Sequence, residues 1–156
     1  MNRADLTDVD GTILAALVRA GPDGEAVRRR WSHSAESWVS STIALVRCLQ
    51  AIEREQAVGG EPSADPLELL RLLSAGIVIR PIPMAALRRP APHQPMFNLS
   101  SVDRLELAAA RNWRCNWLIT NNTQLRDAAL AAGINSFSIQ PPASMGDWPG
   151  RSPIPP

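Results

Sequence analysis

The chain has 156 residues, of which 45% are hydrophobic and 20% are charged. These values are those of one globular domain with its own core, and they exclude a chain that is disordered throughout. Sixteen basic and fifteen acidic residues leave a net charge of +1, so nucleic acid or an anionic membrane could be bound only through a local patch.

Short apolar runs separated by turn residues fill the first quarter of the chain. They predict, in order, a strand at 6–9, helices at 13–18 and 25–32, and a strand at 38–39. Gly21 and Pro22 end the first of these helices, because neither residue favours the interior of a helix. Ser40 or Ser41 is expected to cap a long helix that follows at 42–57.

The middle of the chain contains the longest predicted helix and the most proline-rich connection. Leu45, Cys48, Leu49 and Ile52 recur at helical spacing and form a core-facing stripe. The elements predicted after this helix are a polar loop at 61–65, a helix at 67–74 and a buried strand at 77–79. Residues 81–95 contain five prolines, which predicts an irregular segment with at most one helical turn near 84–88.

The last third of the chain alternates helix and strand most clearly. The predicted elements are a helix at 102–112 capped by Ser100 and Ser101, a strand at 117–119, a helix at 125–132 and a strand at 134–139. This alternation predicts an α/β fold, a three-layer α/β/α sandwich around a parallel sheet of four or five strands. Residues 1–140 would form the domain, and the proline-rich residues 141–156 an irregular or disordered tail.

Polar residues follow two of the predicted strands. Asp8 and Asp10 lie at the end of the first strand, Thr120 to Asn122 follow the strand at 117–119, and Asp103 stands in the first turn of a helix. Ligands gather at the carboxyl edge of an open parallel sheet, and carboxylates there suit Mg²⁺ or Mn²⁺. Such a metal would generate hydroxide and neutralise a phosphodiester transition state. Each residue also has an ordinary explanation as a turn or helix-end residue, so the pattern alone leaves both interpretations open.

One resemblance is to the haloacid-dehalogenase-like phosphatases. Residues 8–13 match their opening DxDGT motif, and residues 118–122 look like their second motif. The resemblance implies that Asp8 is a nucleophile, Asp10 an acid–base and Thr120 a phosphate ligand. That family has a lysine and paired acids further along the chain, whereas no lysine follows Thr120 here. We keep this function as an alternative.

A second resemblance, over about residues 6–139, is to PIN domains, the nuclease fold of VapC-type toxins. Residues 10–14 resemble the opening motif D-T-x-hydrophobic-L, and residues 102–110 are similar to the family's D-A-hydrophobic-hydrophobic-L-A-x-A helix. Residues 118–125 match hydrophobic-T-x-D-x-x-L, and Gly133 with Ile134 matches the closing motif. The last two blocks stand at the spacing of the family, which makes this resemblance the more extensive one.

The PIN resemblance implies a site of about four acids that together attract a metal ion. Placed residue by residue, these positions fall on Asp10, Arg47, Asp103 and Asn122. Asp10 and Asp103 would be the remnant catalytic and metal-binding acids, whereas Arg47 replaces a glutamate and Asn122 an aspartate. A guanidinium cannot ligate a cation and repels one. We expect Arg47 to bridge Asp10 and Asp103 in place of the metal.

Three other acids, Asp8, Glu106 and Asp127, are near enough in the pattern to compensate for the two that are lost. The resemblance therefore implies a protein related to metal-dependent endoribonucleases of toxin–antitoxin systems, with a degraded catalytic site. The alternative is an active ribonuclease with a rearranged site, whose cofactor would be Mg²⁺ or Mn²⁺. Whether the protein is an enzyme stays open at this point.

The same resemblance implies RNA and an antitoxin-like protein as partners, and a homodimer. No run of eighteen apolar residues suggests a membrane segment, and the first residues do not resemble a signal peptide. We therefore expect a cytoplasmic protein that does not bind membranes.

Overall fold

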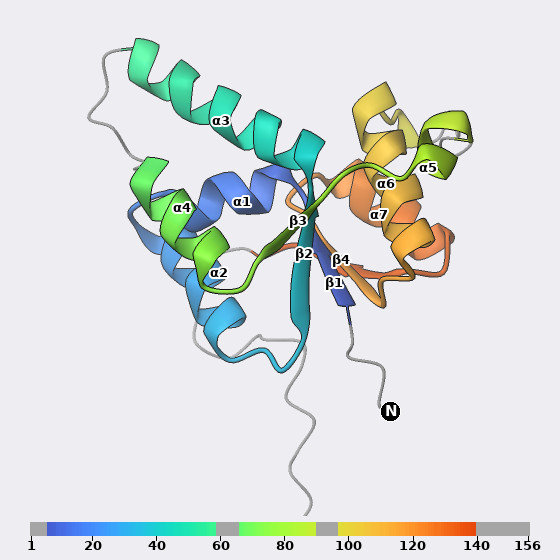
Figure 1. Ribbon diagram of the computed structural model, residues 1–156, viewed down its shortest axis with the longest axis horizontal. Helices are drawn as coiled ribbons and strands as arrows, with labels where there is room; N and C mark the ends of the chain where they lie inside the picture. Colours follow the sequence, from blue (N-terminus) through green and yellow to red (C-terminus); the bar gives the residue numbers. More distant parts are fainter. Residues whose placement is uncertain (1–5, 59–65, 90–96, 140–156) are drawn as a thin grey trace, which may run out of the picture.

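The computed structural model describes residues 6–58, 66–89 and 97–139 (Figure 1). These residues form one five-stranded sheet in the order β3-β2-β1-β4-β5, with every neighbouring pair parallel. The strands are β1 (Leu6–Val9), β2 (Ser37–Ser41), β3 (Val78–Arg80), β4 (Trp117–Ile119) and β5 (Asn135–Phe137). The predicted parallel sheet is therefore confirmed, with five strands.

Helices cover both faces of the sheet, with α1 to α4 on one side and α5 to α7 on the other (Figure 1). Their bounds are α1 (Gly11–Val18), α2 (Pro22–Ser32), α3 (Thr42–Ala57), α4 (Pro66–Ser74), α5 (Met84–Arg88), α6 (Ser101–Trp113) and α7 (Thr123–Ala131). Trp38 and Ile119 pack in the α1–α4 layer, whereas Val39 and Leu118 pack in the other layer. Neighbouring residues of a strand thus bury opposite faces, as expected for a sheet that is covered on both sides.

Side chains that cap helices gather at the carboxyl edge of the sheet. Asp10 follows β1 and caps α1, Ser41 ends β2 and caps α3, and Asn122 lies just beyond β4 and caps α7. Each side chain accepts hydrogen bonds from backbone amides that the first helical turn leaves unpaired. Because the strands are parallel, these three polar side chains belong to the same edge.

Helices α1 and α3 approach each other closely at Gly11. A Cβ at Gly11 would lie 2.9 Å from the Ala44 carbonyl oxygen and 2.9 Å from the Arg47 Cβ. Both distances are shorter than van der Waals contact, so the approach needs a residue without a side chain. The contact brings the helix that carries Arg47 beside the N-terminus of α1, where Asp10 stands.

Most predicted boundaries agree with the structure within two residues, and several of the differences have local causes. Helix α1 begins at Gly11 rather than residue 13, because the Asp10 side chain caps it there. Helix α2 begins at Pro22 rather than residue 25, since the fixed φ of proline suits the first helical turn. Strand β3 lies one residue later than predicted, and β5 occupies only the middle of the predicted strand at 134–139.

Some predictions fall outside the described residues. These are the loop at 61–65, most of the second half of the proline-rich segment at 81–95, and the tail at 141–156 with its domain boundary. The single helical turn predicted near 84–88 is present as α5. Within the described ranges, no helix combines the length and the apolar character needed to cross a bilayer.

Candidate functional site

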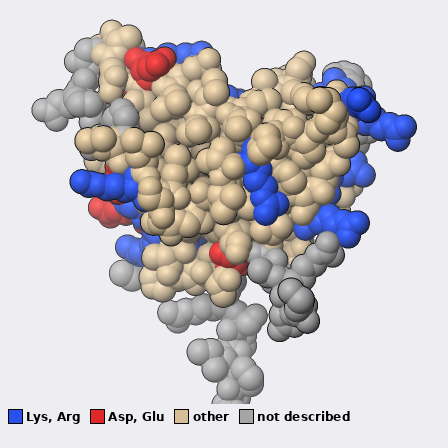
Figure 2. Space-filling model, viewed as in Figure 1, with Lys and Arg blue, Asp and Glu red and all other residues tan. Residues whose placement is uncertain are grey.

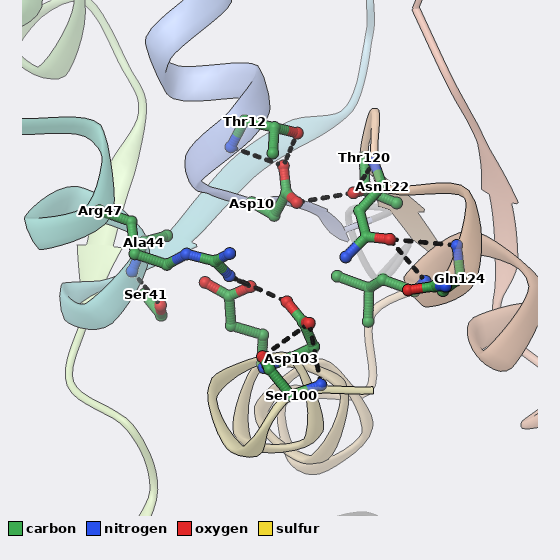
Figure 3. Close-up of polar contacts among 12 residues, drawn as sticks. Asp10, Thr12, Ser41, Ala44, Arg47, Ser100, Asp103, Thr120, Asn122 and Gln124 are labelled. Atoms are coloured by element: carbon green, nitrogen blue, oxygen red, sulfur yellow. Dashed lines mark hydrogen bonds and ion pairs between the residues drawn. The ribbon is translucent and has the colours of Figure 1, made fainter. Parts of the chain in front are cut away.

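The Asp10 carboxylate accepts four hydrogen bonds at the N-terminus of α1. Oδ1 accepts from the Thr12 amide at 3.0 Å, from Thr12 Oγ1 at 2.6 Å and from the Ile13 amide at 3.1 Å. Oδ2 accepts from Thr120 Oγ1 at 2.6 Å (Figure 3). Burial raises the pKa of Asp10, and the hydrogen bonds and the charge of Arg47 offset part of that rise. Asp10 therefore ties β1, α1 and the end of β4 together.

Asp103 lies in the first turn of α6 and divides its two oxygens between two tasks. Oδ2 accepts from the Ser100 amide at 3.2 Å and from Ser100 Oγ at 2.7 Å, while the Asp103 amide donates to Ser100 Oγ at 3.1 Å. This reciprocal arrangement is a capping box. Oδ1 points the other way and accepts from Arg47 Nη1 at 2.9 Å (Figure 3).

The Arg47 guanidinium reaches from α3 to α6 and pairs with two acids. Nη1 lies 2.9 Å from Asp103 Oδ1 and 3.5 Å from Glu106 Oε2, and the side chain is 35% exposed. Partial burial lowers the pKa of Arg47, but the hydrogen bond to Asp103 and the charges of Glu106, Asp103 and Asp10 outweigh it, so the pKa is raised. Arg47 is therefore a permanent cation in this site.

Arg47 was predicted to bridge Asp10 and Asp103, and of these two the structure shows a hydrogen bond to Asp103 only. Asp103 is one of them, but among the described residues the second hydrogen-bonded acid is Glu106 rather than Asp10. The reason is that Asp10 directs its carboxylate into the first turn of α1 and toward Thr120. Asp10 still acts on Arg47 through its charge.

Glu106 is the most deeply buried acid that faces Arg47. Its side chain is 2% exposed, and no described group forms a hydrogen bond with Oε1. Burial raises the pKa of Glu106 to about 9, with the charges of Asp10, Asp8 and Asp103 adding to the rise and Arg47 opposing it. The charge of Arg47 therefore offsets only part of the rise in the Glu106 pKa.

Asp8 lies in β1, two residues before Asp10. It is 3% exposed, and burial raises its pKa well above the usual range, with the charge of Asp10 adding to the effect and a backbone hydrogen bond at Val9 opposing it. Asp8 and Asp10 are two residues apart on one strand and so share a face of the sheet. Asp8 also raises the pKa of Glu106 through its charge. The structure thus brings Asp8, Asp10, Asp103 and Glu106 into one electrostatic group.

Asn122 lies beside the acidic residues of the site (Figure 3), whereas Asp127 pairs with a residue on the surface of α7. Asn122 Oδ1 accepts from the Gln124 and Leu125 amides at 3.1 and 3.3 Å, so its amide nitrogen is the atom that points toward Asp10 and Asp103 (Figure 3). Asp127 is 49% exposed and pairs with the neighbouring Arg126 at 2.8 Å. Of the three acids considered as compensating, Asp127 has its carboxylate engaged with Arg126 on the surface of α7.

Sequence reasoning missed the part played by Thr12. Its Oγ1 donates to Asp10 Oδ1 at 2.6 Å and accepts from the Asn121 amide at 3.0 Å, which links α1 to the loop after β4. Thr120 Oγ1 is similar, since it donates to Asp10 and accepts from the Asn122 amide at 2.9 Å. A hydroxyl residue two positions after a capping aspartate was the available signal for Thr12.

These residues do not fit a divalent metal ion as they stand. In the described part of the chain, no three His, Cys, Asp or Glu residues are grouped so that they could hold one. Arg47 takes Asp103 Oδ1 and Glu106 Oε2, the oxygens that would face a cation, and Asn122 offers a nitrogen that bears hydrogens. Figure 2 shows that acidic and basic side chains are scattered over the visible face, most of them near its outline. The arrangement is an internally neutralised acidic cluster.

Comparisons with known proteins place this geometry in context. A family model described as the PIN domain matches residues 9–130. The fold is similar to that of PAE2754 from Pyrobaculum aerophilum, which is 17% identical with a TM-score of 0.61 and coverage of 87% of this chain and 90% of the other. It is also similar to VapC20 of Mycobacterium tuberculosis, a sarcin–ricin loop cleaving toxin, at 17% identity, a TM-score of 0.55 and coverage of 82% and 95%.

A third similar structure is FitAB bound to a DNA fragment, at 14% identity and a TM-score of 0.54, with coverage of 85% of this chain and 94% of the other. At these identities the likeness concerns the fold. The sequence has no significant match among curated proteins.

Proposed function

Because this chain belongs to the PIN domain family, we propose that it is a nuclease-like protein of the toxin–antitoxin type whose site no longer cleaves RNA with Mg²⁺ or Mn²⁺. One observation carries the proposal, namely that the Arg47 guanidinium lies 2.9 Å from Asp103, inside the acidic cluster. A metal-dependent nuclease needs that cluster to attract a cation. Here a fixed cation of the chain itself already neutralises it.

The second substituted position supports the same proposal. Asn122 keeps the helix-capping role of an aspartate, because its Oδ1 accepts two backbone amides. It contributes no negative charge, and its amide nitrogen cannot bind a cation. The loss of one acid at position 122 and the reversal of charge at position 47 act in the same direction, since both lower the attraction for a metal.

A cleavage assay tests this function. Fluorogenic single-stranded RNA is incubated with the wild type and with Mg²⁺ or Mn²⁺, and the rate is compared with that of Asp103→Asn, which keeps a side chain able to cap α6. We expect both proteins to stay at background. Cleavage by the wild type that Asp103→Asn abolishes would refute the proposal and establish the alternative, an active ribonuclease with a rearranged site. The observation that favours this alternative is the extra acid Glu106.

The phosphatase alternative depends on Asp8 as a nucleophile. Asp8 is 3% exposed, so a phosphate ester cannot reach its carboxylate without a rearrangement. We therefore expect no hydrolysis of p-nitrophenyl phosphate with Mg²⁺. Turnover that disappears in Asp8→Asn would restore that function.

The partners remain part of the proposal. VapC20 is described as a toxin, and FitAB is seen on DNA, which supports an antitoxin-like protein as a partner of this chain and RNA as a retained ligand. A homodimer and a cytoplasmic location complete the proposal. Light scattering during gel filtration would decide between monomer and dimer, and fluorescence anisotropy with labelled RNA would test RNA binding without cleavage.

A further inference from the structure

Arginines are concentrated on helices α5 and α6. Five arginines lie in these two helices or at the residue that directly follows each of them, namely Arg88, Arg89, Arg104, Arg111 and Arg114. Four of these side chains are exposed, and that of Arg104 is partly buried. Because α5 packs against α6, the five arginines belong to one region of the surface, which we call the arginine face.

The acids of the same two helices do not offset this charge at the surface. They are Asp103 and Glu106, which are 5% and 2% exposed and face Arg47. In the described part of the chain, no salt bridge joins the exposed arginines of the arginine face to an acid. The arginine face therefore keeps its positive charge, although the whole chain has a net charge of only +1.

The other side of the sheet has a different charge pattern. Three arginines there are paired with acids, in the salt bridges Arg19–Glu55, Arg30–Glu36 and Arg71–Glu68. Figure 2 shows basic side chains but no acidic one on the part of the visible face where Figure 1 places α5 and α6. Positive charge is thus concentrated on one part of the molecule rather than evenly distributed.

The chemistry of the arginine face fits the phosphodiester backbone of a nucleic acid. All sixteen basic residues of the chain are arginines. A guanidinium presents a planar set of donors that matches two oxygens of one phosphate, and it stays charged at neutral pH. Arg104 and Arg111 stand about two turns apart on α6, roughly 10 Å along the helix axis, so they can contact different phosphates of one strand.

An aromatic side chain beside these arginines favours a single strand. Trp113 lies between Arg111 and Arg114 in the sequence, and its side chain is partly exposed. Proteins that bind single-stranded nucleic acid combine a basic surface, which follows the backbone, with aromatic rings on which bases stack. Both elements are present at the end of α6.

We propose that the arginine face of α5 and α6 binds the phosphate backbone of single-stranded RNA. The inference rests on the proposed function, in which RNA is a ligand that the protein retains but does not cleave. It assigns binding to exposed arginines outside the acidic cluster of Asp10, Asp103 and Glu106. Binding of RNA therefore needs no divalent cation.

The experiment measures binding of a fluorescently labelled polyuridine oligonucleotide to the full-length protein by anisotropy, in EDTA and at several salt concentrations. Each variant and the control remove two exposed arginines, so they change the net charge equally. The variants are Arg88→Gln/Arg111→Gln and Arg89→Gln/Arg114→Gln, and the matched control is Arg29→Gln/Arg54→Gln, in the last turns of α2 and α3. Because all of these positions are exposed, each protein should melt like the wild type.

If the arginine face neutralises five phosphates, the affinity of the wild type should fall about 100-fold between about 50 and 200 mM salt. Each double variant should bind more weakly and lower the slope of log K against log salt by about 1.4, whereas the control should keep the slope of the wild type. A wild type that does not bind the RNA, or a control that loses as much affinity as the variants, would overturn the proposal.

Vesicles that contain phosphatidylserine form a second arm of the experiment, because their headgroups also carry phosphate. Binding to vesicles but not to RNA would overturn the proposal. The cleavage assay separates this inference from the proposed function. Absence of both RNA binding and cleavage would refute the inference and leave the loss of catalysis standing, whereas cleavage together with binding that depends on the arginine face would refute the loss of catalysis and support the inference.

Discussion

Replacing Glu106 by glutamine should change how the stability of the protein depends on pH. Glu106 is buried, and its pKa is raised from 4.5 to about 9 in the folded protein. A glutamine side chain in its place would keep the size and a carbonyl oxygen for Arg47, but it cannot ionise. Any change in pH dependence between the two proteins therefore reports the proton on Glu106.

The raised pKa of Glu106 means that its contribution to stability decreases as the pH rises. Glu106 is protonated in both states below pH 4.5, so its contribution to stability is complete there. As pH rises, the unfolded chain loses the proton while the folded protein keeps it, and stability falls until the pH passes about 9. Each pH unit in this window costs about 1.4 kcal/mol, so the change between pH 5 and pH 8 is roughly 3–4 kcal/mol.

Urea denaturation followed by circular dichroism at pH 5 and pH 8 measures this quantity. The wild type should lose roughly 3–4 kcal/mol more than Glu106→Gln between the two pH values. Glu53→Gln, which changes an exposed acid on α3, is the control and should follow the wild type. If the wild type and Glu106→Gln lost stability equally, Glu106 would be ionised at neutral pH and our account of the buried proton would be wrong.

Three further substitutions test individual contacts. Thr120→Val removes the 2.6 Å hydrogen bond to Asp10 and should destabilise the protein by about 1–3 kcal/mol, whereas Thr120→Ser should restore most of the loss; equal melting of the two would contradict this. Asn122→Ala should cost about 1 kcal/mol through the lost helix cap, and Asn122→Asp should not; urea midpoints decide between them. Gly11→Ala should lower the Tm because its Cβ would lie 2.9 Å from the Ala44 carbonyl oxygen, and an unchanged Tm would show that α1 and α3 can separate freely.

The parts of the fold that could be predicted were those with a strong local pattern. The long helix α3 (Thr42–Ala57) was predicted with both ends correct, because Ser41 is a good cap and the apolar stripe has helical spacing. Strand β4 was also correct, since an apolar run stands between clear turn residues. The strand order could not be read from such patterns, because pairing is decided by contacts between segments far apart in the sequence.

The candidate site was predictable in its residues but less so in its contacts. Parallel strands bring their carboxyl ends to one edge, which accounts for the meeting of Asp10 with Thr120. The choice of Glu106 over Asp10 as a partner of Arg47 depends on where the Asp10 carboxylate points, which is into the first turn of α1 and toward Thr120, and no spacing in the sequence encodes that direction.

Three of the four positions of the candidate site also stabilise the first turn of a helix, which limits the substitutions that they tolerate. Asp10 and Asp103 each hold the first turn of a helix, so a change at either would harm folding whether or not the protein still cut RNA. The side chain at position 122 also caps a helix, and asparagine does so without a charge. Position 47 lies inside α3 and caps no helix, so its side chain can change without the loss of a cap. A substitution at position 47 therefore tests the electrostatics of the site without also removing a helix cap, whereas replacing Asp10, Asp103 or Asn122 by alanine would do both.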